Sequence, residues 1–92
     1  MIAAAECECL IPSAHSLKEK RAVLQRVMTR LKQKFNVSVA EVDFQDMWQR
    51  TVIAIVVVSS SKISSERELQ KALLYLDSFP ELERTVTNIE WL

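Results

Sequence analysis

The chain has 92 residues, with 12 basic and 12 acidic side chains, so its formal net charge is zero. A chain of this length is expected to form one domain, residues 1–92, that buries roughly 60 to 65 per cent of its unfolded surface and leaves little room for a deep substrate cavity. The sequence contains no glycine. Phosphate-binding loops and dinucleotide fingerprints need glycine where the backbone closely approaches a phosphate, so both kinds of nucleotide site are excluded.

The zero net charge hides a segregation along the sequence. Residues 15–34 contain seven basic side chains and one acidic side chain, whereas residues 35–92 contain five basic and nine acidic ones. The basic segment therefore predicts an oriented contact with phosphate or with an acidic protein, although the chain as a whole is not a basic polyelectrolyte.

No membrane segment or signal peptide is expected, because the longest apolar run, residues 52–58, is far shorter than the roughly 20 residues that span a bilayer. Cys7 and Cys9 lie one residue apart and would point the same way along a strand, which favours two reduced thiols. We therefore expect a cytoplasmic protein.

The first half of the chain predicts a strand, a helix and a hairpin. Apolar residues alternate over residues 2–11, and Ser16 with Glu19 forms a capping box before a helix that runs to about Phe35. Residues 36–44 change the phase of their alternation, which indicates a strand with a bulge or with a change of exposed face. Residues 50–59 contain a run at 52–58 that is apolar without alternation, which predicts a strand that is central or that exposes one face to a partner.

The second half predicts one helix and one strand. Ser65 and Glu68 resemble a second capping box, and Pro80 ends the helix near Phe79. Residues 85–92 are rich in β-branched and aromatic side chains, which is typical of a strand. The order β-α-β-β-α-β predicts an α+β, ferredoxin-like fold with two helices on one face of a four-stranded antiparallel sheet.

The basic helix and the hairpin are the main candidates for binding nucleic acid. On the helix, the expected phosphate contacts are Lys18, Lys20, Arg21, Arg26, Arg30 and Lys34. In the hairpin, Trp48 beside Arg50 is suited to stack on a base or to anchor a protein interface. The alternatives are a solvated helix surface and a Trp48 that folds back over the sheet edge.

Other chemistry is weakly represented in the sequence. Cys7 and Cys9 supply too few ligands for a metal, and His15 is the only histidine. The acidic cluster of Glu41, Asp43 and Asp46 has the ligand type for Mg²⁺ but is typical of a solvated hairpin. We expect no cofactor and no enzymatic activity. In particular, the loop at residues 12–15 lacks the arginine and glycine of the acylphosphatases, which share this topology.

Two segments carry a resemblance to a known family. Residues 16–21 and 35–50 are similar to the two signatures of the YlxP-like family, small bacterial proteins classed as a domain of unknown function. The matching positions are Ser16, Leu17, Lys18, Glu19, Lys20, Arg21, Asn36, Glu41, Asp46, Trp48, Gln49 and Arg50. Family members often have glycine where this chain has Ala4 and Ala54.

The resemblance implies a ferredoxin-like fold and a role near ribosome maturation or translation, because the family's gene commonly lies between those for a translation initiation factor and a ribosome-binding factor. It supplies no catalytic residues. The leading hypothesis is a non-enzymatic accessory factor that docks on ribosomal RNA or on a ribosome-associated protein. The alternative is a homodimeric module for protein interaction or small-ligand binding that uses its open sheet face.

Overall fold

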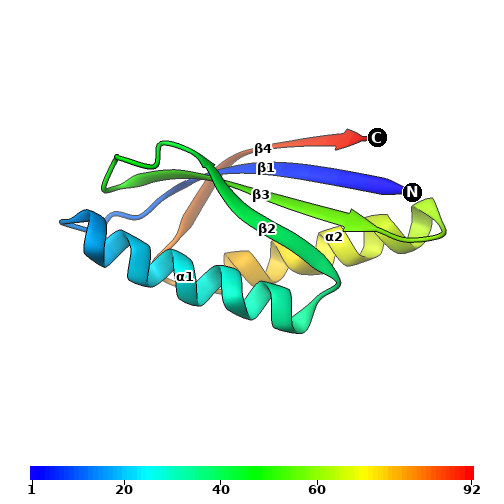
Figure 1. Ribbon diagram of the computed structural model, residues 1–92, viewed down its shortest axis with the longest axis horizontal. Helices are drawn as coiled ribbons and strands as arrows, with labels where there is room; N and C mark the ends of the chain where they lie inside the picture. The colour runs from blue at the N-terminus through cyan, green and yellow to red at the C-terminus, as the bar shows by residue number, and fades with distance from the viewer.

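The computed structural model describes all 92 residues and has the predicted element order. The elements are β1 (Ile2–Leu10), α1 (Leu17–Lys34), β2 (Val37–Asp43), β3 (Arg50–Val58), α2 (Lys62–Asp77) and β4 (Glu83–Trp91). The strands form one antiparallel sheet in the order β2-β3-β1-β4, and both helices lie on the same side of it (Figure 1). The ferredoxin-like prediction is confirmed.

The core lies between the helices and one face of the sheet. Alternate residues of β1, from Ala3 to Cys9, are fully buried there, and Leu24, Val27 and Leu31 of α1 pack into the same core. The prediction that β3 is central is confirmed, because it pairs with β2 on one side and with β1 on the other. The intervening residues point to the opposite side of the sheet, which no helix covers and which we call the open face.

The start of α1 follows from its cap. The side chain of Ser16 accepts a hydrogen bond from the Glu19 amide at 3.1 Å, as predicted. The Glu19 carboxylate does not return the bond to Ser16, because it accepts instead from the His15 amide at 2.6 Å. The cap therefore also ties the loop before the helix to its first turn.

We expect Ser16→Ala to lower the free energy of unfolding by about 1 kcal/mol, because one amide of the first turn loses its acceptor. Ser13→Ala is the matched control, since Ser13 is exposed in the same loop. Urea denaturation of the two variants checks the prediction. Equal stability of both variants would show that the cap contributes nothing.

The start of α2 differs from the sequence prediction. The helix begins at Lys62, where Ser61 accepts a hydrogen bond from the Ser64 amide at 3.1 Å. Ser65, the predicted cap, is fully buried within the helix, and its hydroxyl donates to the Met1 carbonyl at 2.8 Å. The prediction was wrong because two serines four residues apart both offer a capping side chain, and only the packing of Ser65 against the chain start separates them.

Strand β2 contains an irregularity, and β4 is fixed to α2 where it begins. The register of β2 against β3 shifts between Glu41 and Asp43, which is an irregularity of the kind that the change of phase predicted. The last strand begins at Glu83, earlier than predicted. Arg84 holds this start against α2 by donating two hydrogen bonds to the Asp77 carboxylate, at 2.8 and 2.7 Å. These hydrogen bonds lower the pKa of Asp77.

Candidate nucleic-acid interface

The cations of α1 separate into three groups around the helix. At about 100° per residue, Lys20 falls on the buried stripe with Leu24 and Leu31. Two exposed flanks remain, one on each side of this stripe. Lys18, Arg21 and Lys32 lie on the flank away from α2, and Arg26, Arg30 and Lys34 lie on the flank beside it.

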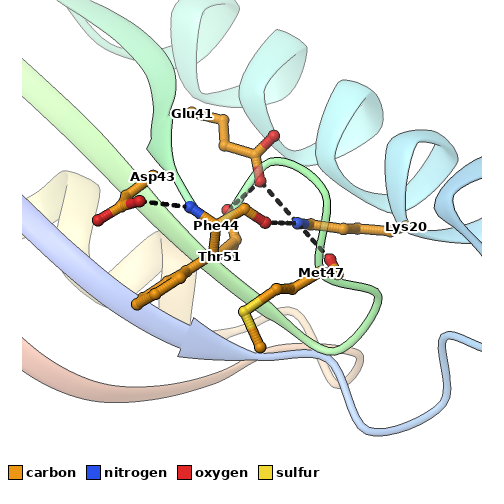
Figure 2. A network of polar contacts seen from close by, with 6 residues as sticks. All are labelled: Lys20, Glu41, Asp43, Phe44, Met47 and Thr51. Carbon is orange, nitrogen blue, oxygen red and sulfur yellow. Dashed lines mark hydrogen bonds and ion pairs between the residues drawn. The ribbon is translucent and has the colours of Figure 1, made fainter.

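Lys20 holds the β2–β3 loop and does not face solvent. Its Nζ donates to the carbonyls of Phe44 and Met47, each at 2.6 Å, and lies 2.9 Å from the Glu41 carboxylate (Figure 2). Lys20 is fully buried. The prediction that it contacts phosphate is therefore wrong, because the helix turns this cation toward the core, where β2 and the β2–β3 loop supply its acceptors.

The loop needs this support because its backbone is strained. Phe44 adopts a positive φ of 56°. For a residue other than glycine, this left-handed conformation is less stable by roughly 1–2 kcal/mol. The amide of Phe44 donates to the Asp43 carboxylate at 2.8 Å, while its carbonyl accepts from Lys20. In a chain without glycine, hydrogen bonds on both sides of Phe44 hold the turn in place.

The flank beside α2 is lined by aromatic rings. Arg30 lies over the ring of Phe79 at 5.9 Å and Lys34 over the ring of Tyr75 at 4.6 Å, which are cation–π distances. Arg26 pairs with the Glu81 carboxylate. The rings restrain the stems of Arg30 and Lys34 without neutralising their charge. These cations therefore stay available to an anion.

Most of the α1 cations have no acidic partner. The ion pairs of the protein involve Lys20, Arg26, Arg50 and Arg84 only. The α1 cations without a carboxylate within ion-pair distance are Lys18, Arg21, Arg30, Lys32 and Lys34. This unneutralised set forms the candidate interface.

Trp48 stands exposed at the end of the molecule where the β2–β3 loop meets the first turns of α1. Its exposed fraction is 52 per cent, which favours a tryptophan that faces solvent over one that folds back across the sheet edge. Its neighbours are fixed. Lys20 binds the Met47 carbonyl, and the Gln49 side chain donates to the carbonyls of Pro12 and Ala14, each at 3.0 Å. Trp48 therefore projects from a braced loop, that is, a loop held in place by hydrogen bonds at the residues on both sides of Trp48.

Arg50 is engaged elsewhere. It pairs with the Glu8 carboxylate on the open face, and its guanidinium lies 4.2 Å from the centre of the Phe44 ring. The guanidinium of Arg50 therefore lies on the side of the sheet opposite to α1.

The other candidate groups are also accounted for by contacts within the protein. Glu41 binds Lys20 and accepts from the Thr51 hydroxyl at 2.6 Å, which removes it from the predicted acidic cluster. No three His, Cys, Asp or Glu side chains come close enough together to hold a metal ion. Cys7 and Cys9 are free thiols in the core, and burial raises both pKa values. Neither helix is long and apolar enough to cross a membrane.

These features define a small ferredoxin-like α+β protein with exposed cations on its helix layer. The family model described as "Protein of unknown function (DUF503)" matches residues 2–89. The chain is also 59% identical over 91 residues to the "Uncharacterized protein YlxP" of Bacillus subtilis (strain 168), with 99% of each chain covered. The chain therefore belongs to the DUF503 family, and the resemblance to YlxP-like proteins is confirmed.

Proposed function

We propose that this protein is a non-enzymatic accessory factor that docks on ribosomal RNA through α1. The observation that carries the proposal is the set of five α1 cations without an acidic partner. Two of them, Arg30 and Lys34, lie four residues apart, about 6 Å along the helix axis, in a row with Arg26, which pairs with Glu81. Such a row suits contacts with successive phosphates, and phosphate contacts supply most of the affinity of sequence-independent binding.

The distribution of charge over the two faces supports an oriented complex. Glu6 and Glu90, which have no cationic partner, lie on the open face of β1 and β4, away from the helices. An RNA that approaches the protein is attracted by α1 and repelled by these carboxylates. The helix layer therefore faces the RNA in the complex that we propose.

Trp48 extends this surface beyond the first turns of α1. An exposed indole on a braced loop is suited to stack on an unpaired base, which contributes about 1–3 kcal/mol in single-strand complexes. The central strands offer no aromatic side chain on the open face, so RNA recognition in the manner of an RNA-recognition motif does not fit this protein.

The test is binding to purified small ribosomal subunits and to structured ribosomal RNA fragments at 50 and 200 mM salt. We expect binding at low salt that weakens steeply at the higher concentration. Arg30→Glu/Lys34→Glu should weaken binding at least tenfold and reduce the slope of log K against log salt by about 2, because two phosphate contacts are lost.

The matched control is Lys62→Glu/Arg67→Glu, which changes the net charge equally but alters exposed residues of α2. It should retain most of the affinity. Equal losses in the two double variants would mean that only net charge matters, and absence of binding at either salt concentration would refute the proposal. Binding to whole subunits but not to their RNA would favour a protein partner.

A further inference from the structure

Exposed apolar side chains gather at one end of the molecule, remote from Trp48. Both chain termini and the start of α2 lie at this end (Figure 1). Ile2 pairs with Val58, Leu92 donates its amide to the Ile2 carbonyl, and Lys62 lies over the Trp91 ring at 5.1 Å. The exposed apolar side chains of this end, which we call the apolar end, are Met1, Ile2, Val58, Ile63, Ile89, Trp91 and Leu92.

The apolar end includes an unpaired sheet edge. β4 is an outer strand, and its only partner is β1. The amide of Leu92 donates to β1, and in an antiparallel pair every second residue bonds to the partner strand. The amides and carbonyls of the residues between, Thr87, Ile89 and Trp91, therefore point to the outer edge of the sheet. An exposed edge of this kind is a template for another strand.

The two edges of the sheet differ in how they are protected. β2 is interrupted by its irregularity and packs under α1. β4 is regular from Val86 to Trp91, and α2 packs on β1 and β3 rather than over it. As a result Ile89 and Trp91, which point to the helix side, are still 43 and 39 per cent exposed. A partner at β4 would complete the helix-side core.

We propose that a second copy of this chain occupies this edge, with the two β4 strands antiparallel about a two-fold axis at Ile89. In this register Ile89 lies opposite its own copy and Trp91 lies opposite Thr87 of the second copy. On the open face, Glu90 lies opposite the Asn88 amide, which is able to donate to it. Shifting the axis to Glu90 would place two carboxylates in direct opposition, which cross-strand pairing disfavours.

The second copy fits better here than on the open face. Two open faces brought together would oppose the unpaired carboxylates of Glu6 and Glu90 of both copies, whereas the β4 register opposes no like charges. Pairing at β4 joins the two sheets into one of eight strands. It places Ile89 and Trp91 between β1 and the β4 strand of the second copy. It leaves both copies of α1 free, so this inference stands independently of the proposed RNA contact.

Sedimentation equilibrium from 1 to 100 μM measures the association of the unmodified protein. We expect a species of twice the 10.6 kDa chain mass. Ile89→Lys and Ile89→Glu should each yield monomers, because each places like charges at the axis. An equimolar mixture of the two variants should restore a dimer, since lysine then faces glutamate. That rescue is specific to an axis at Ile89.

Leu74→Lys is the matched control, because Leu74 is exposed on α2 outside the apolar end. It should remain dimeric, and circular dichroism melts confirm that every variant is folded. A monomeric unmodified protein at 100 μM would overturn the proposal. A dimer that persists in Ile89→Lys would also overturn the proposal. In that case an Ala40→Lys variant tests whether two copies meet through the open face.

Discussion

Replacing Lys20 by methionine should lower the free energy of unfolding by about 3–5 kcal/mol, the usual cost of breaking a buried ion pair by removing one partner. The variant leaves the Glu41 carboxylate without its cation and the carbonyls of Phe44 and Met47 without their donor. Methionine has a similar length and removes only the charged end. Urea denaturation at one protein concentration measures the change.

Two comparisons separate the buried contacts from loss of charge alone. Lys18→Met removes an exposed cation from the same helix and should change stability by less than about 0.5 kcal/mol. The double variant Lys20→Met/Glu41→Leu should recover part of the loss, because no carboxylate then remains uncompensated. A loss below 1 kcal/mol for Lys20→Met would show that water replaces the lysine in the loop.

The same variant links stability to the proposed interface. Hydrogen exchange at residues 44–49 should accelerate in Lys20→Met, since the loop loses its anchor on α1. The affinity for RNA should fall only by the part that Trp48 contributes, because Arg30 and Lys34 keep their contacts with phosphate. Lys20 thus acts on the interface only by positioning the loop.

The second large effect is a loss of stability at alkaline pH. Burial raises the pKa of Cys9 to about 12, and burial also raises the pKa of Cys7. The unfolded thiols release their protons near pH 8.5–9, whereas the folded ones retain theirs. Their contribution is therefore complete below about pH 8.5 and declines as the pH rises toward 12. We expect Cys9 alone to cost about 2 kcal/mol at pH 10.5.

Urea denaturation at pH 7.5, 9 and 10.5 measures this decline. Cys7→Ala/Cys9→Ala is the control, because it removes both thiols and keeps every other ionisable side chain. Its stability should depend less on pH than that of the unmodified protein. Parallel pH profiles would show that the thiols are not responsible.

The regular elements were predictable because their patterns are local. The alternation of β1, the helical spacing of Leu24, Val27 and Leu31, and the Ser16 cap each depend on residues within a few positions of one another. The start of α2 was not predictable in this way. Ser61 and Ser65 are equally good capping residues by sequence, and only the hydrogen bond of Ser65 to the Met1 carbonyl distinguishes them.

The individual roles of the charged residues were less accessible. The spacing of Lys20 from Leu24 and Leu31 is a signal that this lysine faces the core, but its acceptors come from β2 and from a loop whose carbonyls lie 24 and 27 residues away in the chain. The four-residue spacing of Arg26, Arg30 and Lys34 is enough to place them along one flank of the helix. Their contacts with Glu81, Phe79 and Tyr75 depend on how α2 packs beside α1.

The sequence by itself determined the ferredoxin-like class, the central place of β3, the buried cysteines and the concentration of cations on α1, because each follows from composition and short-range periodicity. Only the tertiary structure decided which cations face solvent, that Trp48 stands exposed, and that β4 leaves an apolar edge uncovered. Those properties depend on distant segments packing together, and a zero net charge on 92 residues contains no information about which face each charge occupies.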